Sequence, residues 1–369
     1  MESPSKTRFI PIGLMLFALF FGAGNLIFPA SMGQASGTEV WWALLGFCLT
    51  GVGLPLLTLV AVGYSGLPGL QEIGSRVHPW FGAFYANVCI LAIGPCFAVP
   101  RTGTVSWEIG IAPFLDPSQL EVGMPVFLAV FFIVAGWLSA SPSKLVDRVG
   151  KILTPLLVLS LAIFIVQSCL APMGEPQEPA APYATPFMAT VQGFLDGYQT
   201  MDTLAGLNFG AVIALNIQAL GVTEPREVER GTIRAGFLAA GLFAVVYAML
   251  THIGGIAGAA FPGCETGAET LTLLANALFG RVGQVLLAAI FIIACFNTCV
   301  GLLSSCSTYF HTLLPRFPAS AWAAFFALLS MVIANAGLDQ ILEFSVPVLN
   351  ILYPPAIVLI LLSFLPERL

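Results

Sequence analysis

The stretch FFGAGNLIFP, from Phe20 to Pro29, lies within an apolar segment but is poorly suited to a continuous helix. It places Gly22 and Gly24 on either side of Ala23, and Asn25 follows directly. Glycine weakens a helix, and backbone that leaves the helical conformation at membrane depth must be buried in protein or line a cavity. The stretch therefore predicts an interrupted transmembrane helix. The alternative is that these glycines only let neighbouring helices pack closely.

A second stretch, DGYQTMDTLAGLNFG from Asp196 to Gly210, has the same character. Its glycines are interspersed with tyrosine, threonine, aspartate and asparagine in a segment that is otherwise apolar. Flexible backbone and polar side chains again predict a helix that breaks inside the membrane. A break exposes helix ends, which bind an anionic group at an N-terminus and a cation at a C-terminus. Two such breaks would therefore suit the binding of a zwitterionic ligand together with a metal ion.

Composition places the whole chain in a membrane. Hydrophobic residues make up 58% of the 369 residues and charged residues only 9%, whereas a soluble domain has about 25% charged residues. The net charge of -6 gives no indication of a nucleic-acid partner. The cysteines and histidines form no metal-ligand pattern, and no HExxH, GxSxG or Walker A motif occurs, so the sequence predicts neither an enzyme nor an ATPase.

A bilayer core about 30 Å thick needs about 20 apolar residues per helix. This window identifies ten candidate spans, at residues 9–32, 40–63, 80–112, 124–140, 150–171, 187–219, 231–256, 280–312, 319–336 and 338–364. With a cytoplasmic N-terminus, the inside loops hold nearly all of the 13 Lys and Arg residues, and the outside loops hold only Arg281. This asymmetry predicts a multi-pass inner-membrane protein in that orientation.

The two broken spans are the first and the sixth, so each opens a block of five. Residues 1–171 and 187–369 would then form two halves, joined by a proline-rich outside connector at 172–186. An odd number of spans per half inverts the second half, and interrupted helices at equivalent places in inverted halves are typical of secondary transporters. The predicted fold class is therefore an all-α polytopic membrane protein, with ten helices in two inverted five-helix repeats.

The outside segment GAETLTLLANALF, at residues 267–279, reads as a short amphipathic helix that ends at Gly280. Two roles are equally compatible with it. It is either a lid over a pathway or a helix that only packs on its neighbours.

Motifs along the whole chain resemble one family. They are FALFFGAGNLIFP (17–29), AIGPCFAVPRTGTVSWEIGIAP (92–113), GYQTMDTL (197–204), GVTEPR (221–226) and SVPVLNILYPPAIVL (345–359). They resemble the bacterial branched-chain amino acid carriers. The resemblance implies a LeuT-type fold and sodium-coupled import of leucine, isoleucine and valine by alternating access. Members usually have twelve spans, so it also implies that the usual helices 11 and 12 are absent from this chain.

The resemblance and the two breaks together predict a substrate site between the first and sixth spans. The backbone at residues 22–25 would meet the carboxylate, carbonyls at residues 198–202 would meet the ammonium, and apolar side chains would surround the aliphatic group. The candidate residues are Gly22, Ala23, Gly24, Asn25, Phe97, Tyr198, Thr200, Met201 and Asp202. One methylene is worth only about 1–3 kcal/mol in an apolar pocket, so we expect broad selectivity among aliphatic side chains.

The resemblance also implies a sodium site between the first and eighth spans, with sodium as a co-transported ion. Its predicted ligands are the carbonyls of Ala18, Phe21 and Val300 and the hydroxyl of Ser304. The neighbouring Leu303 offers no hydroxyl where some relatives have threonine. The alternative is a proton-coupled transporter of another small amino acid, with Asp202 as the proton carrier.

Charged side chains within spans are costly and usually functional. Arg101 and Glu108 are seven residues apart on one helix face and are candidates for gating or an ion pair. Arg101 would pair with Asp202 and fix the third span to the break in the sixth; a static pair without a functional role is the alternative. A channel is less favoured, because no filter-like repeat occurs. We expect a monomer surrounded by lipid.

Overall fold

The computed structural model describes residues 9–65, 67, 69–140, 175–207, 225–261, 264 and 266–365, together with seven separate positions between 155 and 170. All the regular structure in these residues is helical. Six of the described helices are long and apolar enough to cross a membrane, and α14 (Ala319–Ala334) is a shorter apolar helix. The predicted all-α membrane class is therefore confirmed. Apart from those separate positions, the predicted fifth span lies outside the described residues.

The first predicted span is interrupted at the expected place. Helix α1 (Phe9–Phe20) ends before Phe21, and α2 (Ala23–Ser36) begins after Gly22. Gly22 is extended, with φ −128° and ψ −161°, and its N–H donates to Asn25 Oδ1 at 3.0 Å. The Asn25 side chain thus satisfies a backbone group that the break leaves without a helical partner.

The sixth predicted span is interrupted as well. Helix α10 (Pro186–Asp196) leads into the 3₁₀ turn η7 (Gly197–Thr200), and helical residues resume at Asp202. Between them Met201 has φ 62°, a left-handed conformation that is uncommon for a residue with a side chain. The carbonyl of Phe194 near the end of α10 accepts a hydrogen bond from the Thr50 hydroxyl at 2.8 Å. Tertiary contacts therefore hold the break in place.

The remaining helices overlap predicted spans, apart from the short α5, which lies between two of them. They are α3 (Val40–Cys48), η3 (Leu49–Gly53) and α4 (Leu54–Ser65); the short α5 (Leu70–Ser75); α6 (Pro79–Leu91), η4 (Ala92–Cys96) and α7 (Ala98–Gly110); α8 (Pro117–Ala140); α12 (Pro225–Ala260); α13 (Gly267–Leu313); and α15 (Leu338–Leu362). Short 3₁₀ turns η2 (Gly37–Glu39), η5 (Ala112–Phe114) and η6 (Ala181–Tyr183) lie in the connections.

The third span carries a break that the sequence analysis missed. Its middle, η4, is a π-helical turn in which Gly94 has φ −88° and ψ −117° and is followed by Pro95. Proline supplies no backbone donor, and π turns inside helices are frequent at functional sites. This turn sets the direction of α7 and so places Arg101.

The predicted outside helix at 267–279 is present as the first part of α13. It ends at Gly280, whose φ of 61° is left-handed, as the sequence predicts. The Gly267 N–H donates to Ser31 Oγ of α2 at 2.7 Å, and Ala268 and Leu271 are buried. The helix therefore packs against α2, and its role as a lid stays a prediction.

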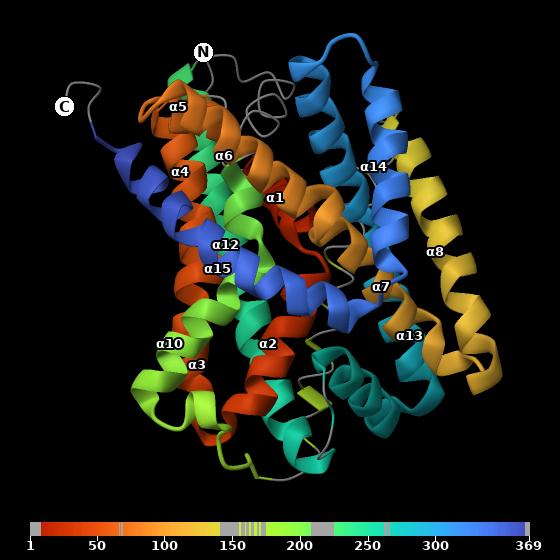
Figure 1. The fold of residues 1–369 in the computed structure, drawn as a ribbon. Coiled ribbons are helices and arrows are strands. Elements are labelled where there is room, and N and C mark those ends of the chain that lie inside the picture. The colour runs from red at the N-terminus through yellow and green to blue at the C-terminus, as the bar shows by residue number, and fades with distance from the viewer. Residues whose placement is uncertain are drawn as a thin grey trace.

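Glycines bring the central helices into close contact. A Cβ at Gly33 of α2 would lie 2.0 Å from the Thr251 carbonyl oxygen of α12, and one at Gly254 would lie 2.0 Å from the Ala30 carbonyl oxygen. Small residues at interfaces are the usual means by which membrane helices approach each other. Helix α2 therefore packs directly on α12, in the middle of the molecule (Figure 1).

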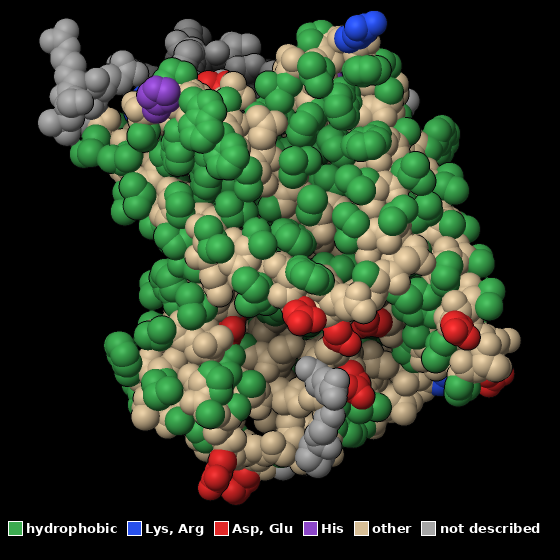
Figure 2. Space-filling model, in the orientation of Figure 1, with side chains coloured by type: hydrophobic (Ala, Val, Ile, Leu, Met, Phe, Trp, Pro, Cys, Tyr) green, Lys and Arg blue, Asp and Glu red, His purple; other side chains and the backbone are tan. Residues whose placement is uncertain are grey.

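The outer surface suits lipid. Hydrophobic side chains cover most of the face in Figure 2, and acidic side chains gather in its lower part. On α8, Trp137 is 72% exposed and Ile133 is 68% exposed. Exposed apolar area on this scale would be unfavourable in water.

Candidate functional site

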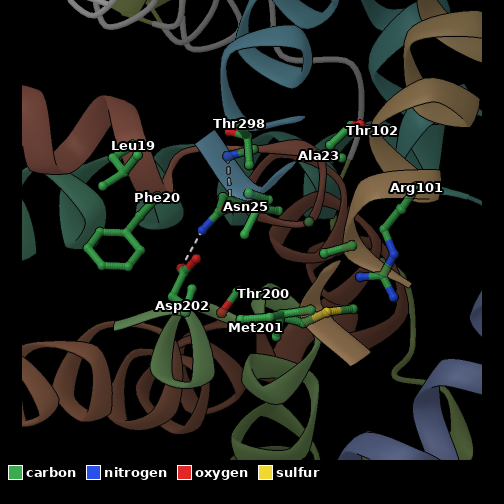
Figure 3. Close-up of a pocket in the computed structure, with 16 residues that line it drawn as sticks. Leu19, Phe20, Ala23, Asn25, Arg101, Thr102, Thr200, Met201, Asp202 and Thr298 are labelled. Carbon is green, nitrogen blue, oxygen red and sulfur yellow. Dashed lines mark hydrogen bonds between the residues drawn. The ribbon is translucent and has the colours of Figure 1, made fainter. Parts of the chain in front are cut away.

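A cavity lies between the two interrupted helices (Figure 3). Its polar lining comes mainly from the two breaks, and an apolar part comes from α1, η4, α7 and α13. Among the predicted substrate residues, those lining it are Gly22, Ala23, Gly24, Asn25, Thr200, Met201 and Asp202. Phe97 and Tyr198 are not in the lining; Tyr198 instead stacks on Tyr353 of α15, with ring centroids 4.1 Å apart. The volume of the cavity is about 40 Å³.

Glycine at position 24 lets the two breaks touch. A Cβ on Gly24 would lie 2.9 Å from the Gln199 carbonyl oxygen and 3.3 Å from Thr200 Cα. Gly22 faces Thr298 of α13, whose Cγ2 would lie 2.9 Å from an added Cβ. The sequence analysis predicted that these glycines admit a ligand to the backbone. The structure shows the alternative, close packing against neighbouring segments, and access of a ligand to this backbone stays a prediction.

A polar network connects the breaks to α12. Asn25 Nδ2 donates to Asp202 Oδ2 at 2.5 Å and to Tyr247 Oη at 2.7 Å. The Tyr247 hydroxyl lies 3.3 Å from the same carboxylate oxygen, to which it donates. All three side chains are buried. The sequence analysis missed Tyr247, although a tyrosine in an otherwise apolar span is a visible signal.

Arg101 reaches the sixth-span break from α7, but not through the predicted partner. Its Nη1 donates to the Gln199 carbonyl oxygen and its Nη2 to Ser345 Oγ, both at 2.8 Å. Its Cζ lies 5.1 Å from the centroid of the Phe28 ring. Within the described residues no ion pair joins Arg101 to Asp202, so that predicted pairing is wrong. The predicted link between the third span and the break does exist, through a backbone carbonyl.

Glu108 lies two helical turns beyond Arg101 on α7 and is half-buried. A separation of seven residues is a rise of about 10 Å along a helix. The side chain is not among those that line the cavity. Glu108 and Arg101 therefore share a helix without sharing a site.

Polar side chains of α13 meet the carbonyls at the end of α1. Asn297 Nδ2 donates to the Ala18 carbonyl oxygen at 3.0 Å, and the Thr298 hydroxyl donates to the Phe21 carbonyl oxygen at 3.0 Å. Among the described residues, Asn297 Oδ1 is buried and has no hydrogen-bond partner. An unsatisfied buried acceptor is rare in proteins, and a ligand is one explanation for it.

The predicted cation ligands Val300 and Ser304 lie elsewhere on α13. The Val300 carbonyl oxygen accepts a hydrogen bond from Ser139 Oγ at 3.2 Å. Ser304 is six residues beyond Thr298, a rise of about 9 Å along the helix. The expected hydroxyl of Ser304 is therefore replaced at these carbonyls by Thr298, with Asn297 beside it. The sequence analysis therefore assigned the wrong residues of α13 to the contact with α1.

These features define a class. Two interrupted membrane helices that face one buried, partly polar cavity are the architecture of a secondary transporter. Over residues 5–369 the chain matches the family described as branched-chain amino acid transport protein, and it belongs to that family. This confirms the resemblance.

Several named relatives cover almost the whole chain. Over 365 residues it is 43% identical to the branched-chain amino acid permease BraB of Bacillus subtilis. This match covers 99% of this chain and 81% of the relative. It is 43% identical over 360 residues to the branched-chain amino acid transport system 2 carrier protein of Pseudomonas aeruginosa (96% and 80%). It is 40% identical over 357 residues to the permease BrnQ of Escherichia coli (96% and 80%). These are transport proteins, not enzymes.

The fold is similar to that of MhsT, whose crystal structure holds L-phenylalanine. The TM-score is 0.65 at 18% identity, and the match covers 97% of this chain and 88% of that chain. At this identity the likeness concerns the fold alone. It agrees with the LeuT-type fold that the sequence resemblance implies.

Proposed function

We propose that this chain imports leucine, isoleucine and valine across the bacterial inner membrane by alternating access, coupled to sodium. In this proposal ten spans form two inverted halves, at residues 1–171 and 187–369, with the N-terminus in the cytoplasm. The observation that carries the proposal is the cavity between the two breaks, in a chain of the branched-chain amino acid transport family.

The lining of the cavity suits an aliphatic amino acid. Its polar groups come from the two breaks, and its apolar side chains include Leu19, Phe20, Ile93, Ala205 and Leu302. An apolar wall of this kind distinguishes leucine, isoleucine and valine only weakly, because one methylene changes the binding free energy by about 1–3 kcal/mol. Broad selectivity among the three is the expected outcome.

The size of the cavity favours a conformational change during binding. At about 40 Å³ it is well below the roughly 150 Å³ of a cavity that accommodates benzene. Leucine has more heavy atoms than benzene. The helices around the cavity must therefore move apart when the substrate enters, as alternating access requires.

The proposed sodium site lies where α1 ends and α13 passes. The carbonyls of Ala18 and Phe21, the Thr298 hydroxyl and Asn297 Oδ1 supply oxygen atoms there. Hard cations bind carbonyl, amide and hydroxyl oxygens. The unpartnered Asn297 Oδ1 supports this set, because turning the amide would bring that oxygen toward a cation beside the Ala18 carbonyl. Proton coupling through the buried Asp202 is the second candidate.

Uptake of labelled leucine into proteoliposomes that contain the purified chain, driven by a sodium gradient or by a pH gradient, tests the proposal. We expect uptake with sodium and little without it, and competition by valine and isoleucine but not by lysine. Uptake that ignores sodium and follows a pH gradient would favour proton coupling. Absence of leucine uptake under both gradients would contradict the proposed function itself.

A further inference from the structure

Arg101 is a buried charge that lines the cavity. Its side chain is 2% exposed, and Figure 3 shows its guanidinium beside the cavity, with Asp202 on the opposite side. Thr200 and Met201 lie between these two side chains. The positive and negative groups of the site therefore face the same space from different helices.

The guanidinium retains capacity to bind an anion. It donates hydrogen bonds to two neutral oxygens, the Gln199 carbonyl and the Ser345 hydroxyl, and its Nε is buried without a partner among the described residues. Within the described part of the chain, no carboxylate forms an ion pair with it. A guanidinium has five N–H donors, so most of its donors remain available. An unpaired buried charge costs several kcal/mol, and a bound counter-ion would offset that cost.

We propose that Arg101 binds the carboxylate of the amino acid substrate, while Asp202 binds its ammonium group from the other side of the cavity. This inference rests on the proposed function and adds the residue that recognises the carboxylate. A guanidinium matches a carboxylate geometrically, since two parallel N–H groups can donate to its two oxygens. In Figure 3 Ala23, at the start of α2, lies on the same side of the cavity as Arg101. The positive end of α2 and Arg101 thus favour an anion in one place.

The Gly22 amide does not serve this purpose in the structure, because it already donates to Asn25 Oδ1. The sequence analysis placed the carboxylate on the backbone at residues 22–25. Arg101 adds a full positive charge to the partial positive charges of these backbone N–H groups. It also supplies a reason for keeping a guanidinium in a helix at membrane depth, where charged side chains are usually functional.

The alternative explanation for the buried guanidinium is purely structural. Arg101 would then only hold α7 against η7 and α15, through its hydrogen bonds to Gln199 and Ser345. The two roles predict different responses to ligand chemistry. A structural tie affects every ligand alike. A carboxylate-binding residue affects only ligands that carry a carboxylate.

Calorimetric titration of purified full-length chain with leucine and with leucinamide separates these roles. Leucinamide keeps the ammonium and the side chain but replaces the carboxylate with a neutral amide. In Arg101→Gln we expect leucine affinity to fall about ten- to hundredfold, as for loss of a charged hydrogen bond, and leucinamide affinity to change less than about threefold. Arg101→Lys keeps the positive charge but loses the two parallel N–H donors of the guanidinium. Its leucine affinity should lie between those of the wild type and Arg101→Gln.

Arg281→Gln is the matched control, because Arg281 is exposed at the outer turn of α13 and should leave both affinities unchanged. Equal losses for leucine and leucinamide in the well-folded Arg101→Lys or Arg101→Gln protein would overturn the inference, and so would unchanged leucine binding. Neither result would contradict transport of leucine. Failure of the wild-type chain to bind or take up leucine would instead contradict the proposed function.

Discussion

The substitution Gly24→Ala places one methyl group at the contact between the two helix breaks. A Cβ at this position lies 2.9 Å from the Gln199 carbonyl oxygen and 3.3 Å from Thr200 Cα. Both are backbone atoms, so neither can rotate out of the way as the end of a side chain could. Helix α2 and η7 must therefore move apart to accommodate the methyl group.

The expected magnitude follows from the cost of overpacking. An extra methyl group in a well-packed interior costs about 1–3 kcal/mol. The next residue, Asn25, is hydrogen-bonded to Asp202 at 2.5 Å, so the same movement disturbs the polar side of the cavity. If this cost appears in binding, leucine affinity falls about five- to 150-fold, since 1.4 kcal/mol is tenfold. Gly24→Val, with a β-branched side chain, should abolish binding.

Calorimetric titration of the purified protein with leucine measures this effect. Gly241→Ala in α12 is the control, because a Cβ there has nothing within 4 Å. Alanine also favours a helix over glycine by up to about 1 kcal/mol. The control should bind leucine like the wild type. Wild-type affinity in the Gly24→Ala protein would refute the argument, because the contact between the breaks would then have no role in the site.

Three further predictions test orientation, ion and network. Cysteines introduced at Glu178 and Lys144, in a background without native cysteines, should label from opposite sides of the membrane, Glu178 from outside; labelling from one side would contradict the topology. Thr298→Val should raise the sodium concentration for half-maximal leucine uptake about tenfold, whereas Ser304→Ala should change it less than twofold; the reverse order would restore the site to Ser304. Tyr247→Phe removes the hydroxyl that accepts from Asn25 and donates to Asp202, and it should weaken leucine binding about fivefold; unchanged affinity would exclude the network from the site.

The helix breaks were predictable because their signal is local. Glycine and polar residues stand out within apolar spans, and a membrane gives backbone amides few alternatives to a helix. The helix at residues 267–279, which ends at Gly280, was predictable for a similar reason, since glycine provides the left-handed residue after a helix. The turn in the third span carries the local signal of Gly94 and Pro95, which the sequence analysis did not single out.

The partners across the site were not predictable, because they depend on how helices pack. The sequence shows that Arg101 is a charge in a span, but not that a carbonyl at Gln199 and a hydroxyl at Ser345 will meet it. The error on α13 has the same origin. Successive residues of a helix point about 100° apart, so a shift of register exchanges Ser304 for Thr298 without any change in composition. Only tertiary contacts decide which residue faces α1.

The first break connects the proposed ion and substrate sites within a few residues. The Phe21 carbonyl accepts from Thr298, Gly22 donates to Asn25, and Asn25 donates to Asp202. A cation that fixes the Phe21 carbonyl would also fix the backbone from which Asn25 reaches the substrate cavity. Coupling between two binding equilibria is reciprocal. Sodium should therefore raise leucine affinity by the same factor by which leucine raises sodium affinity, and titrations in both orders should give equal factors. Sodium that left leucine affinity unchanged in these titrations would contradict a connection between the two sites.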